Sequence, residues 1–214
     1  QPLMISLKVA AAATALIFII GGGLAVWLAR SSFRGQSVVE ALIHLPLVLP
    51  PSVVGYYLLV VLGQSGPLAH WLGWNALFTW PAAVIAATIV GLPLMFQASR
   101  AAIANVDPTF EQAARTLGSS ELAVLWRITL PLSRRGIIAG LVLGGTRALG
   151  EFGATSFLAR PSDPTLPVLI FRLIGRPGEL SYGTALAASV VLAATTAVVV
   201  LAVERLRVPS LGAF

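Results

Sequence analysis

The sequence predicts an all-α integral membrane protein, a polytopic bundle of five transmembrane helices, or six with an N-terminal span. The chain has 214 residues, of which 57% are hydrophobic and only 10% are charged. A soluble domain carries about 25% charged residues, so this composition excludes an ordinary cytosolic globule. A membrane helix takes roughly 20 apolar residues, which leaves no room for a separate soluble domain. We expect one transmembrane domain over residues 1–214, with spans at 3–29, 46–62, 81–98, 136–158 and 184–203.

The first three spans are uncharged over most of their length, and the first is followed by Arg30. Prolines lie at the start of the second span, whereas the fourth holds one Arg and one Glu. The connection before the fifth span contains a short apolar stretch at 166–174, interrupted by Arg172. This stretch is too short to cross a membrane, so we expect a re-entrant or outer-face helix there.

Arginine distribution predicts the orientation. Five spans place nine loop arginines on one side and three on the other, and the richer side is cytoplasmic. The nine are Arg30, Arg34, Arg100, Arg115, Arg127, Arg134, Arg135, Arg205 and Arg207; the three are Arg160, Arg172 and Arg176. The C-terminus is then cytoplasmic, and Trp71, Trp74 and Trp80 form an outer aromatic belt. Because Gln1 is not a start methionine, we expect the natural chain to begin earlier; one additional N-terminal span would place both ends in the cytoplasm.

Several kinds of chemistry are excluded by residue counts. The chain has no Cys and two His, which leaves no thiolate metal site or cysteine nucleophile. Lys8 is the sole lysine and lies outside any glycine-rich phosphate loop, so the chain has no Walker nucleotide site. We expect no metal, no cofactor, no enzyme activity in this chain and no nucleic acid, since the net charge of +6 reflects cytoplasmic arginines.

The connection over residues 105–131 predicts a short amphipathic helix. Asp107 suits the N-cap, a proline follows at the first helical position, and Gly118 suits the end. An apolar stripe with spacing i, i+3, i+4, i+7 runs along this helix. Its members are Phe110, Ala113, Ala114 and Leu117. The stripe is suited to a groove on a partner protein, although packing on the chain's own spans or on the lipid surface is an equal alternative.

This connection resembles the cytoplasmic loop of permease subunits in binding-protein-dependent ABC importers. That loop has the form Glu-Ala-Ala, three residues, Gly, nine residues, Ile-x-Leu-Pro. Here Ala113, Ala114, Gly118 and the stretch 128–131 keep the full spacing. The position of the motif's Glu is occupied by Gln112, with Glu111 one residue earlier. By resemblance, the ATPase-coupling residues are Asp107, Phe110, Glu111, Gln112, Ala113, Ala114, Arg115, Leu117 and Gly118.

Four further blocks resemble molybdate permeases, within a family that also serves tungstate and sulfate. They are residues 44–56, 91–95, 111–118 and 147–155. The resemblance implies a pore formed by a homodimer in the bacterial or archaeal inner membrane. It also implies two cytoplasmic ABC ATPase subunits, which hold ATP and Mg, and an extracytoplasmic oxyanion-binding protein. Molybdate is the expected cargo; tungstate or sulfate/thiosulfate is the alternative.

Candidate substrate-pathway residues lie in the second and fourth spans: Pro50, Pro51, Ser52, Gly55, Arg147 and Glu151. Pro46, Pro50 and Pro51 are expected to break the entrance of the second span and free backbone carbonyls. Irregular backbone at membrane depth lies beside protein or a water-filled cavity, so a pore-lining role and helix-entry packing are equal alternatives for this bend. Intramembrane charges need partners, so an ion pair between Arg147 and Glu151 competes with a direct role of Arg147 toward an anion. Gly136, Gly140 and Gly144 favour close helix packing, within the subunit or between copies.

Two other functions fit less of the sequence. An intramembrane serine protease would use Ser65 in Gly-Gln-Ser-Gly, but no His follows His70 to act as a base from a later span. An ion-gradient-driven transporter would use Glu151 as its deep acid, but Arg147 lies one turn away and no internal repeat is detectable. Neither function explains the cytoplasmic motif.

Overall fold

The computed structural model describes residues 1–63, 66 and 77–206. Within these residues the secondary structure is entirely helical, which confirms the predicted class. Three helices are long and apolar enough to cross a membrane, or four if one sharply bent pair counts as a span. Ser65, His70, Trp71 and Trp74 lie outside the described residues.

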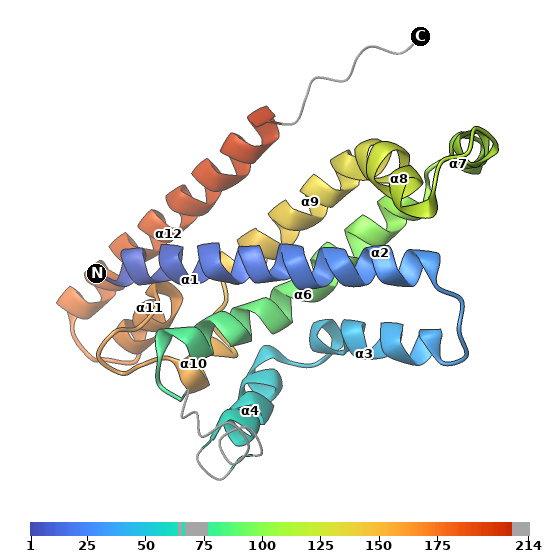
Figure 1. Ribbon diagram of the computed structural model, residues 1–214. Coiled ribbons are helices and arrows are strands. Elements are labelled where there is room, and N and C mark those ends of the chain that lie inside the picture. The colour runs from blue at the N-terminus through green and yellow to red at the C-terminus, as the bar shows by residue number, and fades with distance from the viewer. Residues whose placement is uncertain (64–65, 67–76, 207–214) are drawn as a thin grey trace.

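The first predicted span forms one continuous rod of 29 residues. It consists of α1 (Pro2–Leu16), a π-helical segment η1 (Ile17–Gly22) and α2 (Gly23–Arg30). The rod packs along α6 (Trp80–Ala104), which corresponds to the third predicted span. In Figure 1 it crosses in front of α6 and ends beside the tip that carries α7.

The second predicted span, over 46–62, is interrupted near its start, where its prolines predicted a break, but its bounds differ from the two helices that form. The chain forms α3 (Gln36–Val48) and α4 (Pro51–Leu62), which are bent by 112° at the break between them. Leu49 and Pro50 adopt extended backbone at this corner. The proline pair causes the break, because a residue before proline avoids the α conformation and proline itself lacks an N–H. Pro46, by contrast, is accommodated inside α3.

The fourth predicted span, over 136–158, is also wrong in its extent. Helix α9 (Leu130–Leu149) ends nine residues early, and a separate short helix α10 (Thr155–Leu158) follows. The two glycines at 150 and 153 flank the break. With three arginines among its 20 residues, α9 is also more charged than an isolated span allows.

Close glycine contacts pack α9 along α6. A Cβ added to Gly140 would lie 3.0 Å from the carbonyl oxygen of Met95, and one added to Gly144 would lie 3.1 Å from that of Gly91. Small residues let membrane helices approach this closely. The glycine row therefore serves packing within the subunit, one of its two predicted roles.

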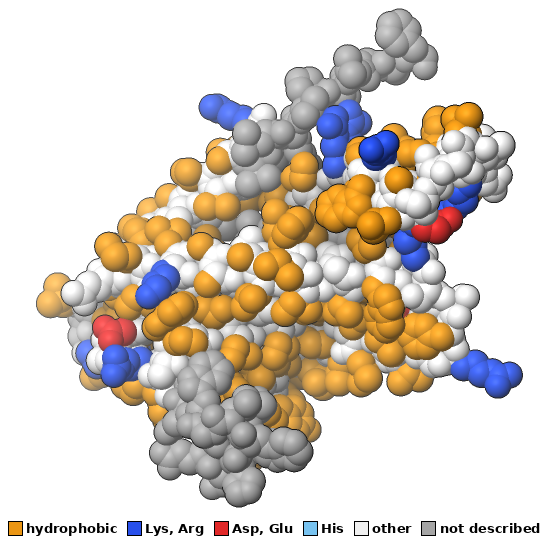
Figure 2. Space-filling view, in the orientation of Figure 1, with side chains coloured by type: hydrophobic (Ala, Val, Ile, Leu, Met, Phe, Trp, Pro, Cys, Tyr) orange, Lys and Arg blue, Asp and Glu red, His pale blue; other side chains and the backbone are white. Residues whose placement is uncertain are grey.

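The C-terminal part consists of α11 (Leu166–Ile174) and α12 (Glu179–Leu206). Helix α11 coincides with the short apolar stretch at 166–174, and α12 contains the fifth predicted span. Only 6% of the apolar window of α12 is buried within the chain. This helix lies at the edge of the molecule, where hydrophobic side chains cover the surface (Figures 1 and 2).

Candidate functional site

The predicted amphipathic helix is α7 (Pro108–Thr116). Its first turn is capped by Asp107, whose carboxylate accepts from the N–H of Thr109 at 2.9 Å. Its last turn closes with Gly118 at φ 85°, and the N–H groups of Gly118 and Ser119 donate to the carbonyls of Arg115 and Ala114. This pair of hydrogen bonds defines a Schellman motif, which favours glycine at its left-handed position. Local sequence signals thus determine both ends of α7.

The apolar side of α7 is uncovered by the described part of the chain. Phe110 is 57% exposed and Leu117 is 87% exposed. The alternative prediction, that the stripe packs on the chain's own spans, is therefore wrong for these two side chains. Ala113 and Gln112 are also exposed, whereas Ala114 is half-buried. The stripe is presented outward, as a partner-binding surface would be.

The exposed apolar surface continues beyond α7 onto α8 (Glu121–Val124) and η2 (Leu125–Thr129). Leu122 and Trp126 are each 65% exposed there. Figure 2 shows hydrophobic side chains gathered over this end of the molecule, among several arginines. We call Phe110, Leu117, Leu122 and Trp126 the docking surface. The last two were missed from sequence, although their i, i+4 spacing was a usable signal.

A polar network holds α7 against the bundle. Glu111 accepts from Thr129 at 2.5 Å and forms ion pairs of 3.1 Å with both Arg30 and Arg115. Arg115 also pairs with Glu121 at 2.6 Å, and Arg30 donates to Thr129 at 2.7 Å. We call these five residues the α7 network. It links the end of α2 to α7, α8 and η2.

The network changes the interpretation of two predicted coupling residues. The side chain of Glu111 is only 20% exposed and is engaged with the chain itself, as is that of Arg115. Gln112, at the motif's Glu position, is exposed instead. The acid therefore tethers α7, and the neutral amide lies on its outer side.

Hydrogen bonds keep the network's carboxylates ionised. The pKa of Glu111 is lowered chiefly by the Thr129 hydroxyl, with contributions from the guanidinium groups of Arg30 and Arg115. The pKa of Glu121 is lowered chiefly by its hydrogen bond from Arg115. The pKa of Asp107 is lowered by the N–H of Thr109 at the helix cap. These contacts thus favour the ionised form of each carboxylate, which is the form that accepts the hydrogen bonds and pairs with arginine.

A cleft of about 480 Å³ lies between the network and the ends of α2 and α6. Arg30, Glu111 and Arg115 form one wall, and Ile103 and Val106 form another. Such space at the base of α7 leaves the helix attached mainly through polar contacts.

The second set of candidate residues surrounds the break after α9. Oε2 of Glu151 lies 2.5 Å from Nη1 of Arg147, and Oε1 accepts from the N–H of Ala154 at 2.7 Å. The Glu151 side chain is fully buried, whereas that of Arg147 is 31% exposed. The predicted ion pair is therefore present, with the cation as its accessible member.

The two broken segments of the chain meet. A Cβ on Gly153 would lie 2.5 Å from the Cβ of Pro51, and one on Gly55 would lie 2.7 Å from the Cα of Ala154. The corner between α3 and α4 thus packs on the α9–α10 break. Gly55 is a buried packing position, whereas Pro50, Pro51 and Ser52 are exposed. This contact was not predicted from the sequence, because about 100 residues separate the two segments.

Comparison with known proteins agrees with this architecture. A family model described as a binding-protein-dependent transport system inner membrane component matches residues 7–207. The molybdenum transport system permease protein ModB of Haemophilus influenzae is 46% identical over 158 residues, 71% of this chain and 69% of its own. The ModB protein of Escherichia coli K12 is 44% identical over 185 residues, 83% of this chain and 81% of its own. These relatives confirm the resemblance to molybdate permeases.

Solved structures share the fold at lower identity. A bacterial ABC transporter involved in alginate import superimposes with a TM-score of 0.78 at 20% identity, covering 96% of this chain and 77% of that chain. The inward-facing MetNI methionine ABC transporter superimposes with a TM-score of 0.77 at 14% identity, covering 96% and 92%. Since the family model spans residues 7–207, this chain belongs to the inner membrane components of binding-protein-dependent transport systems.

Proposed function

We propose that this chain is the permease subunit of an ATP-driven importer of molybdate. The observation that carries this proposal is the docking surface, an apolar face that the described chain leaves uncovered at the end of a tethered helix. Molybdate as the cargo is supported by the 44–46% identity to molybdenum permeases. Tungstate and sulfate or thiosulfate remain the alternative cargoes.

Two copies of the chain enclose the pore in this proposal, with a cytoplasmic ATPase subunit on each copy and an oxyanion-binding protein outside. The end that carries α7 is then cytoplasmic, as is the C-terminus. This orientation is supported by the basic residues around α7 and η2. Nucleotide and Mg are bound by the partner ATPase, so this chain transmits motion and performs no chemistry.

The coupling contacts in this proposal divide into two groups. Phe110, Gln112, Ala113 and Leu117 contact the ATPase directly, because they are exposed. Glu111 and Arg115 transmit movement inward through the α7 network, while Asp107 and Gly118 fix the helix ends and Ala114 its seating. When the two ATPases close on ATP, both α7 helices move together and pull on Arg30 at the end of the first rod.

The anion path in this proposal runs past the meeting point of the two breaks. Pro50 offers exposed irregular backbone there, Pro51 and Ser52 follow in the exposed first turn of α4, and Arg147 offers a partly exposed cation. Glu151 holds the guanidinium in place from the buried side. A second copy would supply a second arginine, and two such cations suit a dianion.

Uptake into sealed vesicles tests the function. Vesicles that hold the permease, its ATPase and its binding protein should accumulate labelled molybdate only when ATP is present on the ATPase side. Excess unlabelled sulfate should leave uptake unchanged. Loss of uptake with sulfate would reassign the cargo to sulfate, and uptake without ATP would contradict the mechanism.

A matched pair of variants tests coupling. Ala114→Phe should leave ATP hydrolysis active but abolish its dependence on transport, because a bulky side chain would lift α7 from its seat. Phe171→Ala changes a 61% exposed aromatic side chain at the opposite end and should keep both activities coupled. Equal coupling in the two variants would count against α7 as the transmission element.

A further inference from the structure

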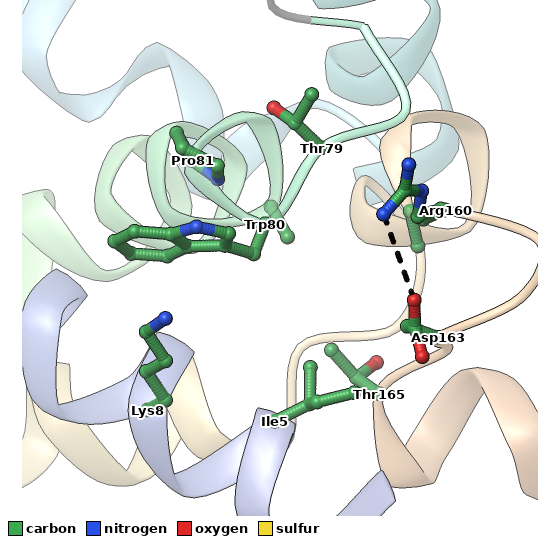
Figure 3. Close-up of a pocket in the computed structure, with 10 residues that line it drawn as sticks. Ile5, Lys8, Thr79, Trp80, Pro81, Arg160, Asp163 and Thr165 are labelled. Atoms are coloured by element: carbon green, nitrogen blue, oxygen red, sulfur yellow. Dashed lines mark ion pairs between the residues drawn. The ribbon is translucent and has the colours of Figure 1, made fainter.

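A second cavity lies at the end of the molecule opposite α7. It has a volume of about 440 Å³ and is enclosed by the second turn of α1, the start of α6 and the segment between α10 and α11. Figure 3 shows Lys8 and Trp80 on one side and Arg160 and Asp163 on the other, with Ile5 and Thr165 below them. None of these residues belongs to the docking surface or to the proposed anion path.

The cavity lies at a membrane–water boundary. Trp80 is the first residue of the α6 span, and Lys8 lies in α1 with its ammonium group 4.0 Å from the centre of the Trp80 ring. Tryptophan and snorkelling lysine are both typical of the headgroup level. Ile5, Pro81 and Ala83 supply apolar walls beside these polar groups. The cavity is therefore amphipathic.

The charges that line the cavity sum to one positive charge, since Lys8 and Arg160 outnumber Asp163. Arg160 and Asp163 are 3.8 Å apart, with side chains 63% and 43% exposed. Such an exposed, long ion pair is weak, so the guanidinium can turn toward a ligand. The two cations face the cavity from opposite sides (Figure 3).

Thr165 supplies an independent indication of a ligand. It lines the cavity and is 4% exposed, yet its hydroxyl oxygen has no hydrogen-bond partner in the described structure. Thr165 is the N-cap of α11, but its side chain makes no capping bond, and the Leu166 N–H donates to Ser6 at 2.7 Å instead. A buried hydroxyl without a partner is unusual. A ligand in the cavity that Thr165 lines would supply the missing partner.

We infer that this cavity binds a tetrahedral oxyanion, the phosphate group of an anionic phospholipid. Two cations and a free hydroxyl suit phosphate oxygens. The volume suits a small organic molecule better than a bare ion, and the apolar walls suit the adjoining glycerol and acyl carbons. Basic pockets between membrane helices bind lipid headgroups in the same way.

Lipid binding to the full chain, purified in a maltoside detergent, tests the inference. Native mass spectrometry measures the Kd of dioctanoyl phosphatidylglycerol, and dioctanoylglycerol serves as the ligand without phosphate. The double variant Lys8→Met/Arg160→Gln should weaken phosphatidylglycerol binding about 25-fold, at about fivefold per cation. Arg176→Gln is the matched control, since it removes an exposed arginine near the same end but outside the cavity.

A Thr165→Val variant separates binding from folding. Valine has the same shape, so the lipid-free chain should melt at an equal or higher temperature once the unpaired hydroxyl is gone. Phosphatidylglycerol binding should nevertheless weaken about tenfold, as expected for a lost hydrogen bond to a charged group.

The outcomes are distinct. Equal affinities of the wild type, the double variant and Arg176→Gln would overturn the site, as would equal binding of dioctanoylglycerol. Displacement of the lipid by millimolar molybdate or inorganic phosphate would keep the oxyanion chemistry but overturn a lipid as its source.

Discussion

One added methyl group should have opposite effects on stability at Gly91, which contacts Gly144 of α9, and at Gly23, where the added group would meet open space. A Cβ on Gly91 would lie 2.8 Å from the carbonyl oxygen of Gly144 and 2.5 Å from Cδ1 of Ile17. The isoleucine end can move, but the carbonyl belongs to the backbone of α9 and can move only with its helix. A Cβ on Gly23 would meet nothing within 4 Å.

The magnitude follows from two opposing terms. Ala is favoured over Gly in a helix interior by about 1 kcal/mol, which applies to both positions. Overpacking a tight contact costs about 2–3 kcal/mol, which applies only at Gly91. The free energy of unfolding should therefore fall by about 1–2 kcal/mol for Gly91→Ala and rise by up to about 1 kcal/mol for Gly23→Ala.

Thermal denaturation in detergent measures both variants. At about 2–4 °C per kcal/mol for a chain of this size, Gly91→Ala should lower the Tm by about 2–8 °C. Gly23→Ala should raise the Tm by up to about 4 °C. Shifts in the same direction would refute the claim that the α6–α9 crossing requires glycine at this point. The glycine of the 91–95 block would then need another explanation.

Three further predictions concern the docking surface, the α7 network and the buried ion pair. Leu117→Asp should weaken ATPase binding at least tenfold in a pull-down. The Tm should stay unchanged because the side chain is 87% exposed, and a large fall in Tm would contradict its outward placement. Because the folded pKa of Glu111 is lowered from 4.5, its network contributes fully above that value and is lost as the pH falls through the lowered pKa. As the pH falls from about 5 to about 3, the amides of α7 should therefore lose protection from hydrogen exchange relative to those of the other helices. Equal protection of α7 at the two pH values would argue against the network. Arg147→Gln should destabilise the chain by about 3–5 kcal/mol, because it leaves the carboxylate of Glu151 buried without its cation. The double variant Arg147→Gln/Glu151→Gln should recover most of this loss in thermal melts. A double variant as unstable as the single one would mean that the arginine acts elsewhere.

The sequence predicted those features that depend on neighbouring residues. Asp107, the following proline and Gly118 specify α7 locally, so both its ends were predictable. Hydropathy located the first rod, α6 and α12, because each is a long apolar run between polar flanks. These features need no knowledge of the tertiary structure.

The sequence predicted a proline break at the start of the second span and easier deformation near Glu151, but it did not place the helix ends at Val48 and Leu149, because the surrounding residues stay apolar. A hydropathy window averages over a corner when both arms are equally hydrophobic. Prolines at 50–51 and glycines at 150 and 153 indicated flexible or interrupted backbone. They did not indicate which of these positions would end a helix. The contact between Gly153 and Pro51 decides this, and it joins segments about 100 residues apart.

The position of Glu111 explains why the docking motif tolerates a neutral residue. Successive residues of an α-helix are rotated by about 100°, so an acid one position earlier faces a different side of α7. At position 111 the carboxylate reaches Arg30 and Thr129 on the bundle side, whereas position 112 is exposed. An acid at 112 in place of Glu111 would be able to bind a basic partner but would remove the Glu111 contact of Arg30. Here the charge secures α7 to its own chain, and in the proposed transporter the apolar docking surface and an uncharged amide are left to contact the ATPase. Exchanging the two residues, Glu111→Gln with Gln112→Glu, should therefore loosen α7 without creating a better coupling helix.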